Sequence, residues 1–366
     1  MPGLVDTTLR EGAQAPVGYL TIEQKRALVT ALARIGVAEI ELGHAVAETS
    51  YGGEPLAELM DVAAAAAPGV RRAIWCRAKA QDIEMAAALR PEVVSFALPV
   101  SDRHLVTRLR RNRPWALDQV IELVDVARSA GVSTVSIGLE DATRTDVGFL
   151  RDVAAAADWA GADRVRIADT VGIAPPELVT GLITEVSLVY GGEIGVHLHN
   201  DFGMATAGAI AAIQAGASWV DVSLLGLGER AGISRLEEVC AWLTLQAGGT
   251  YDLHAVRAIA LRLAEWVERP IGAQAPILGS EIFACESGLH VAGIVRDPAT
   301  YEPCPPEAVG AERSLRLGRN SGRAAVAALV PEAGDLTATA ARVRAAAAAS
   351  RRALDPADFH LGQHSA

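Results

Sequence analysis

Apolar and polar positions over residues 1–250 follow two alternating patterns. Short apolar runs alternate with longer stretches in which apolar residues recur at helical spacing, as expected of alternating strands and helices. The predicted strands lie in GLVDTTLREG, VAEIELG, RRAIWC, EVVSFALP, VSTVSIGLE, RVRIADT, EIGVHLHN and WVDVSLLG. Between them, helices are predicted at Ile22–Ile35, Leu56–Ala66, Trp115–Ala130, Phe149–Ala160, Pro175–Tyr190 and Ala205–Ala215.

This pattern predicts an α/β protein built on a TIM (β/α)8 barrel, because eight strand–helix units over about 250 residues match that fold in number and length. A doubly wound sheet is the alternative, but the chain lacks the GxGxxG pattern typical of that fold. The alternation ends after residue 250. A Gly- and Pro-rich stretch follows the predicted helix Leu253–Val267, and another helix is expected at Thr337–Ala353. We therefore predict a barrel domain at 1–250 and a C-terminal helical subdomain at 251–366.

Composition and charge narrow the function classes. The 366 residues are 51% hydrophobic and 21% charged, with a formal net charge of −11, which argues against general nucleic-acid binding. No apolar run reaches membrane-spanning length, and MPGLVDTTLREG lacks a signal-peptide pattern. The four cysteines show no CxxC spacing, so neither a zinc knuckle nor a disulfide framework is indicated. We expect a cytoplasmic protein with no membrane or nucleic-acid partner.

Two histidines flank one leucine in GVHLHNDFG, at the end of the seventh apolar run. Alternate residues of a strand face one side, so His197 and His199 would point together as half of a metal site, or as a hydrogen-bonded pair. Strand ends meet at one face of a TIM barrel, where Glu11 would be a third ligand. Two imidazoles and a carboxylate suit a divalent Lewis acid, and Arg10 could clamp a substrate carboxylate.

Polar residues end most of the other predicted strands as well. Glu140-Asp141, Asp169-Thr170 and Glu229-Arg230 follow the fifth, sixth and eighth runs. Any one pair could be a salt bridge that seals the rim of the barrel. Polar ends on most strands are harder to explain in that way, because buried charges are costly unless they are paired or bound to a metal. The pattern therefore favours one shared site.

Seven motifs occur in the order DTTLREGAQ, LEDATRTD, ADTVG, HLHNDFGMATA, GLGERAG, ESGLH and YEPCPPEAVG…LGRNSGR. Together they resemble the homocitrate synthase and isopropylmalate synthase family, DRE-TIM metallolyases that join acetyl-CoA to a 2-oxo acid. IWCRA and PVSDRHL are most similar to the homocitrate synthases of nitrogen fixation. The resemblance implies a homodimer, a C-terminal subdomain that reaches the partner's active site, and a divalent ion (Mg, Mn or Zn) held by Glu11, His197 and His199.

The resemblance also implies roles for individual residues. Arg10 would hold and polarise the 2-oxo acid, Thr170 would bind its carboxylate, and Glu140 would lie near the acetyl group of acetyl-CoA. His290 would belong to the acid–base machinery of the C-terminal region, with an ordinary buried histidine as the equal alternative. Asp6 is expected to be structural.

Three positions depart from the family pattern. The family's HESG is CESG here, and a cysteine near its usual pKa is a poor substitute for imidazole. Either His290 carries more of the acid–base work, or Cys285 has a shifted pKa, or the acid–base route differs. GAQ, with Ala13, replaces GEQ or GNQ, a form seen in citramalate-type synthases. His44 stands where the nitrogen-fixation enzymes have an apolar residue, which suggests that it binds a different distal group of the substrate.

The substrate is therefore left open among 2-oxoglutarate, phosphonopyruvate and pyruvate, which would give homocitrate, 2-phosphonomethylmalate and citramalate. His44, Arg72 and Arg77 are candidates to bind a distal anion. A metal-dependent aldolase or acyl-CoA lyase would share the metal ligands, although GLGERAG lacks the cysteine that hydroxymethylglutaryl-CoA lyases carry there. A non-catalytic regulatory paralogue is the remaining alternative, and Cys285 is its only support.

Overall fold

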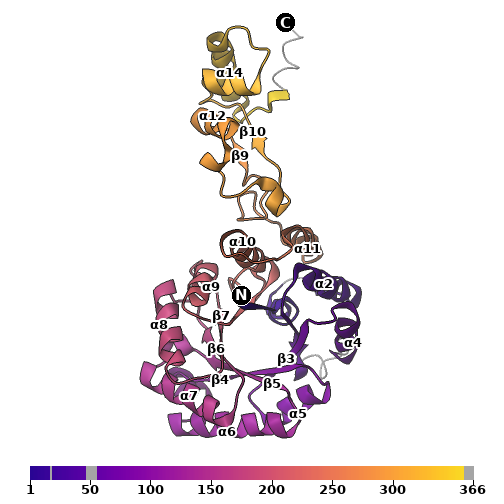
Figure 1. Ribbon diagram of the computed structural model, residues 1–366, viewed down its shortest axis with the longest axis vertical. Coiled ribbons are helices and arrows are strands. Elements are labelled where there is room, and N and C mark those ends of the chain that lie inside the picture. Colours follow the sequence, from indigo (N-terminus) through magenta and orange to yellow (C-terminus); the bar gives the residue numbers. More distant parts are fainter. Residues whose placement is uncertain (17–18, 47–55, 358–366) are drawn as a thin grey trace. The chain divides into compact units, whose positions relative to one another are not determined.

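The eight predicted strands form a closed parallel barrel in the computed structural model, which describes residues 1–16, 19–46 and 56–357 (Figure 1). The strands follow one another around the barrel in chain order, and Gly3 at the start of the first pairs with Trp219 in the last. They are β1 (Gly3–Asp6), β2 (Glu39–His44), β3 (Arg71–Arg77), β4 (Val93–Pro99), β5 (Thr134–Glu140), β6 (Arg164–Asp169), β7 (Glu193–Leu198) and β8 (Trp219–Val222). The predicted TIM barrel is confirmed.

Helices surround the barrel, and most lie within a few residues of their predicted bounds (Figure 1). They are α1 (Thr8–Glu11), α2 (Ile22–Ile35), α4 (Leu56–Ala66), α5 (Ala80–Ala88), α6 (Arg113–Ser129), α7 (Val147–Ala160), α8 (Pro176–Ser187), α9 (Ala205–Gln214), α10 (Leu236–Gln246) and α11 (Leu253–Trp266). Local chemistry sets the bounds: Thr21 and Gln24 form a reciprocal capping box at the start of α2, and Gly36 ends it in the left-handed conformation. None of the helices described is long and apolar enough to cross a bilayer.

The chain divides into two compact units, Met1–Pro270 and Ile271–Ala366. Helix α11, which we assigned to the C-terminal region, packs against α2 and α10 in the first unit. The second unit contains β9 (Ala284–Cys285), α12 (Gly288–Arg296), β10 (Ser314–Leu315), α13 (Arg323–Leu329) and α14 (Leu336–Ser350). Strands β9 and β10 pair in parallel, and a small core of its own includes Leu317, Val326, Val330, Ala340 and Val343.

The interior of the barrel is charged near the amino-terminal ends of its strands. Glu39 of β2 accepts two hydrogen bonds from Arg164 of β6, at 3.0 and 3.1 Å, and one from Arg71, at 2.7 Å. The Arg164 guanidinium also lies 3.9 Å from the ring centroid of Trp219. Arg164 is fully buried, so this layer is stable only because its charges are paired.

A second charged layer lies one side-chain step along the same strands. Arg166 donates to Asp221 at 2.7 Å and to Glu41 at 3.4 Å, and it also contacts the Ser95 hydroxyl. Side chains from alternate strands form such layers in TIM barrels. The third step carries Ala97 and Ala168, whose small side chains leave space above the charged layer. The fold therefore places a pocket directly over a buried charge network.

Candidate active site

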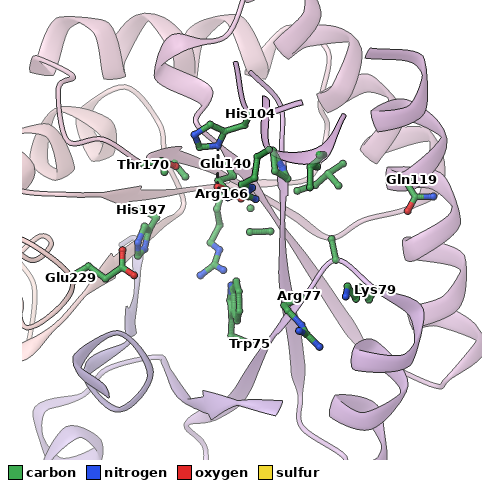
Figure 2. Close-up of a pocket in the computed structure, with 18 of the residues that line it drawn as sticks. Trp75, Arg77, Lys79, His104, Gln119, Glu140, Arg166, Thr170, His197 and Glu229 are labelled. Atoms are coloured by element: carbon green, nitrogen blue, oxygen red, sulfur yellow. Dashed lines mark hydrogen bonds and ion pairs between the residues drawn. The ribbon is translucent and has the colours of Figure 1, made fainter. Parts of the chain in front are cut away.

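The pocket has a volume of about 770 Å³ and opens at the carboxyl ends of the strands. Among the described residues the lining comes from the first unit, and every barrel strand except β2 contributes a residue or the loop that follows it. Figure 2 shows His197 and Glu229 on one side of the pocket and Trp75, Arg77 and Lys79 on another. The strand ends that we singled out therefore share one cavity.

Glu11, His197 and His199 lie together at one wall of this pocket. One ligand atom from each falls within 4.8 Å of the others, and Glu11 Oε2 is 3.8 Å from His197 Nε2. The two imidazoles meet edge to face with their centroids 5.1 Å apart. The residues that we predicted as metal ligands are thus brought together by the fold. Their placement differs from the simple strand-end picture, because Glu11 ends the short helix α1 and His199 follows β7.

The environment prepares both histidines for coordination. His197 Nδ1 lies 2.9 Å from Asp221 Oδ2, so it can donate its proton there and leave Nε2 facing the pocket. Burial, together with the nearby His197, lowers the pKa of His199 to about 4, so its imidazole is neutral near pH 7. Neutral imidazole is the form that binds metal ions. Asp221, held below its usual pKa by Arg166 and His197 despite its burial, remains the charged partner.

Glu11 is held from two sides. Arg10 Nη1 contacts Glu11 Oε2, and although burial opposes ionisation, Arg10 and the two imidazoles lower the pKa of the Glu11 carboxyl. From the other side, a Cβ at Gly228 would lie 2.9 Å from Glu11 Cγ, so only glycine lets the GLGERAG loop approach this closely. One carboxylate and two imidazoles suit a divalent cation. His199 Nδ1 is buried without a hydrogen-bond partner among the described residues, which fits that use.

Arg10 lies between two carboxylates. Its Nε donates to Glu41 Oε2 at 2.6 Å while Nη1 contacts Glu11, and its guanidinium lies 5.5 Å from the centroid of the Trp75 ring. Among the described residues, Nη2 makes no hydrogen bond to the protein. Nη2 is therefore available to donate to a substrate carboxylate, and the predicted clamp by Arg10 remains a prediction.

Glu140 and Thr170 both line the pocket, each with protein contacts. Arg108 binds Glu140 with two hydrogen bonds, at 2.6 and 2.9 Å, and His104 Nδ1 lies 3.2 Å from the same carboxylate. The Thr170 hydroxyl accepts a hydrogen bond from the amide of Asp141 at 2.8 Å. That bond leaves the hydroxyl proton of Thr170 able to donate to an anion in the pocket.

Three other predicted residues lie away from the pocket lining. His44 packs its ring against Trp75, with centroids 4.7 Å apart, and its Nδ1 accepts from the Val46 amide at 3.1 Å. Burial and the nearby Arg77 lower the pKa of His44. Cys285 and His290 belong to the second unit. His290 is exposed there, and its ring packs at a tilt against Tyr301, with the ring centroids 4.2 Å apart. Their catalytic and binding roles remain predictions.

Sequence reasoning missed the side chains that support the site. Glu41, Arg166 and Asp221 are each buried inside a barrel strand, and charged residues within a predicted buried strand were the available signal. His104 lies in PVSDRHL, a stretch that we used only for its resemblance to nitrogen-fixation enzymes, and Arg108 follows three residues after the end of that stretch. Nothing in their spacing indicated a contact with Glu140.

Comparisons with known proteins show the family of this chain. Residues 2–262 match the HMGL-like family model, and residues 277–357 match the model described as homocitrate synthase post-HMGL domain-like. A homocitrate synthase from Frankia alni is 41% identical over 324 residues, which cover 88% of this chain and 90% of that protein. The chain belongs to the homocitrate synthase and isopropylmalate synthase family. The resemblance inferred from the seven motifs is confirmed.

One further relative and one solved structure are also similar to this chain. A 2-phosphonomethylmalate synthase from Streptomyces rubellomurinus is 37% identical over 326 residues, covering 88% of this chain and 86% of that one. The solved HMG-CoA lyase of Bacillus subtilis superposes with a TM-score of 0.64 at 20% identity, over 74% of this chain and 95% of the lyase. That likeness concerns the fold alone.

Proposed function

We propose that this protein condenses acetyl-CoA with a 2-oxo acid, giving a 2-substituted malate and free CoA. The observation that carries the proposal is the Glu11–His197–His199 cluster in a chain whose C-terminal residues 277–357 match the post-HMGL domain of homocitrate synthases. An acyl-CoA lyase or aldolase of the same fold would need the cluster but not that domain. The C-terminal match therefore favours the synthase over these alternatives.

The reaction divides into steps that the residues of the site can serve. A base removes a methyl proton from acetyl-CoA, the resulting enolate forms a carbon–carbon bond to the keto carbon, and the keto oxygen gains a proton. Water then hydrolyses the thioester, which releases CoA. We propose that Glu140 acts on the acetyl methyl group and that Arg10 and Thr170 hold the 2-oxo acid carboxylate. A divalent ion held by Glu11, His197 and His199 would supply Lewis-acid polarisation of the keto acid.

We propose 2-oxoglutarate as the 2-oxo acid, with phosphonopyruvate and pyruvate as the alternatives. The homocitrate synthase of Frankia alni supports the first and the 2-phosphonomethylmalate synthase supports the second. The pocket wall opposite the histidines carries Arg77 and Lys79, which favours a substrate with a distal anion over pyruvate. His44 contacts Trp75 rather than the cavity, so its effect on the substrate would pass through that ring.

The deciding experiment measures thiol release from acetyl-CoA in the presence of Mg²⁺, Mn²⁺ or Zn²⁺ and each of the three 2-oxo acids. We expect the highest kcat/KM with 2-oxoglutarate and loss of turnover in excess chelator. Hydroxymethylglutaryl-CoA is supplied in parallel, because cleavage of that thioester without any synthase activity would establish the lyase instead. Absence of both activities from metal-loaded, folded protein would support the non-catalytic paralogue.

The C-terminal unit provides a separate test of the proposed chemistry. We propose that His290, rather than Cys285, takes part in proton transfer, because an ordinary thiol is a poor proton shuttle near neutral pH. Cys285→Ala is expected to retain most of the turnover, whereas His290→Ala should lose roughly 100-fold or more, the usual scale for an acid–base group. Similar losses in both variants would assign the role to the cysteine.

We further propose that the enzyme is a cytoplasmic homodimer.

A further inference from the structure

A short π-helical segment, His104–Leu109, follows β4 and lies beside the end of β5. The segment ends at Arg110, whose φ of 54° is left-handed. π-Helical turns are rare in proteins as a whole, but those that occur are often found at functional sites. They redirect side chains relative to a regular helix. Three residues of this segment line the pocket, Leu109 and the two polar residues His104 and Arg108.

One carboxylate anchors the start of this segment. The Ser101 hydroxyl donates to Asp141 Oδ2 and accepts from the backbone amide of His104 at 3.2 Å. Asp141 is itself fully buried and receives two hydrogen bonds from Arg144, at 2.8 and 2.9 Å. The π-helical segment is therefore tied to the residue that directly follows Glu140 in the chain.

The neighbouring carboxylate, Glu140, is the one that the segment's side chains contact. Arg108 Nη1 and Nη2 bind the two oxygens of Glu140, one each, in the two-point geometry that fixes the plane of a carboxylate. His104 Nδ1 is buried, lacks a well-aligned hydrogen bond and lies 3.2 Å from Glu140 Oε1 (Figure 2). A carboxylate has about four acceptor positions, so Oε2 keeps more of its capacity for a substrate than Oε1.

We infer that Arg108 and His104 are positioning residues that orient the Glu140 carboxylate toward the acetyl methyl group. This inference rests on the proposed function, in which Glu140 acts on acetyl-CoA. A base that can rotate freely at the rim would spend little time aligned with the methyl proton, and a misalignment of about 1 Å can slow a reaction by roughly 100-fold. The Arg108 pair holds the plane of the carboxylate, and His104 limits rotation on the Oε1 side.

A comparable ion pair outside the pocket supplies the control. Arg113 binds Asp102 with two hydrogen bonds, at 2.7 and 2.8 Å, and neither residue lines the cavity. Both arginines are partly exposed, with side chains at 51% for Arg108 and 39% for Arg113. If Arg108 served only to stabilise the rim, Arg108→Gln and Arg113→Gln should have similar consequences.

The experiment is a double-mutant cycle on the metal-loaded enzyme with Arg108→Gln, Glu140→Gln and the pair together. Arg108→Gln is expected to lower kcat by roughly 10- to 100-fold with little change in the KM of the 2-oxo acid. In the Glu140→Gln background, Arg108→Gln should lower kcat by less than about twofold, because the carboxylate that Arg108 orients is absent. Arg108→Lys, which keeps a single-point cation, should fall between Arg108→Gln and the wild type.

Two further readouts separate positioning from mere stabilisation. Slower proton removal should raise the isotope effect measured with trideuterated acetyl-CoA in Arg108→Gln, while Arg113→Gln should match the wild type in rate and isotope effect. His104→Asn, which keeps a donor near the place of Nδ1, should retain more turnover than His104→Ala. Equal losses in both Glu140 backgrounds, or an unchanged isotope effect, would overturn the positioning role alone. A wild-type enzyme without thiol release would overturn the proposed function and this role with it.

Discussion

Asp221 decides which nitrogen of His197 faces the pocket. The contact at 2.9 Å fixes the tautomer of His197, and Arg166 binds the same Asp221 oxygen at 2.7 Å, so the orienting carboxylate is itself held in place. Partners of this kind raise the basicity of a ligating imidazole and fix its ring. The strength of the proposed metal site therefore depends on residues one layer below it in the barrel.

We predict that Asp221→Asn weakens binding of a divalent ion by roughly 10- to 100-fold, while His197→Ala removes it, because the first loses orientation and the second loses a ligand. Titration calorimetry of chelator-treated protein with Mn²⁺ or Zn²⁺ measures both. Asp82→Asn is the control, since Asp82 is also buried and binds an arginine, Arg77, but lies outside the cluster. Unchanged affinity in Asp221→Asn would show that the carboxylate serves only to balance Arg166.

Glu237 makes the free energy of unfolding depend on pH in the opposite direction to that given by most carboxylates. Burial raises its pKa from 4.5 to about 7, and burial raises that of Asp6 to about 7 as well. The folded state therefore keeps protons that the unfolded chain has released. The stability that these groups contribute is complete below their unfolded pKa values and is lost as the pH rises through about 7.

We predict that Glu237→Gln reduces the fall in the free energy of unfolding between pH 5 and pH 8, by on the order of 2 kcal/mol. Glutamine keeps an oxygen to accept from the Leu225 amide, a bond of 3.0 Å in the structure, and has no proton to lose. Urea unfolding at several pH values, without metal, tests this. The adjacent Glu238→Gln should leave the slope unchanged, and parallel curves for both variants would contradict the assignment.

At the scale of elements, the strands placed the charges in layers that the sequence pattern could not reveal. Glu39 and Glu41 stand two residues apart on β2, and Arg164 and Arg166 stand two apart on β6, so each pair meets at its own level. The contacts join positions 125 residues apart. Which glutamate meets which arginine depends on the tilt and register of the closed barrel, and local periodicity carries neither.

We predict a large difference in stability between two substitutions in the lower layer. Glu39→Ala leaves the fully buried Arg164 with only the half-exposed Glu193 carboxylate, 3.6 Å from its Nε, and should cost about 3–5 kcal/mol. Arg71→Ala removes a partner whose side chain is 30% exposed and leaves the Glu39–Arg164 pair intact, so it should cost about 1 kcal/mol. Denaturant unfolding at pH 7 compares them, and equal losses would mean that the layer is not held by the buried pair.

Most elements could be predicted from the hydrophobic pattern, because a barrel strand is buried on both faces and a surface helix on one. The exceptions have local causes. GLVDTTLREG is not one strand: β1 ends at Asp6, whose carboxylate accepts from the amide and hydroxyl of Thr8 and starts the turn of α1. Arg10 and Glu11 therefore reach the pocket from a helical turn. Helix α5, which we did not specify, is a short alanine-rich stretch.

At the scale of the whole molecule, the proposed chemistry is divided between two compact units. Glu11, His197, His199 and Glu140 belong to the first, and His290 belongs to the second. The motifs identified both parts, whereas their physical boundary could not be predicted from the pattern, because α11 is as helical as its neighbours and only its packing against α2 assigns it. The family resemblance implies that the second unit completes the active site of a partner subunit.

Subunit complementation tests that arrangement directly. We predict that a heterodimer of one His197→Ala chain and one His290→Ala chain is active, although each variant alone has lost most of its turnover. If the C-terminal unit of each chain serves its partner's barrel, one of the two sites combines an intact barrel with an intact C-terminal unit. The other site carries both changes, so the heterodimer should reach about half of the wild-type turnover per dimer. Two affinity tags on co-expressed chains allow the heterodimer to be purified. A heterodimer as inactive as its parents would place each His290 in the site of its own chain, and a monomer in sedimentation would overturn the dimer.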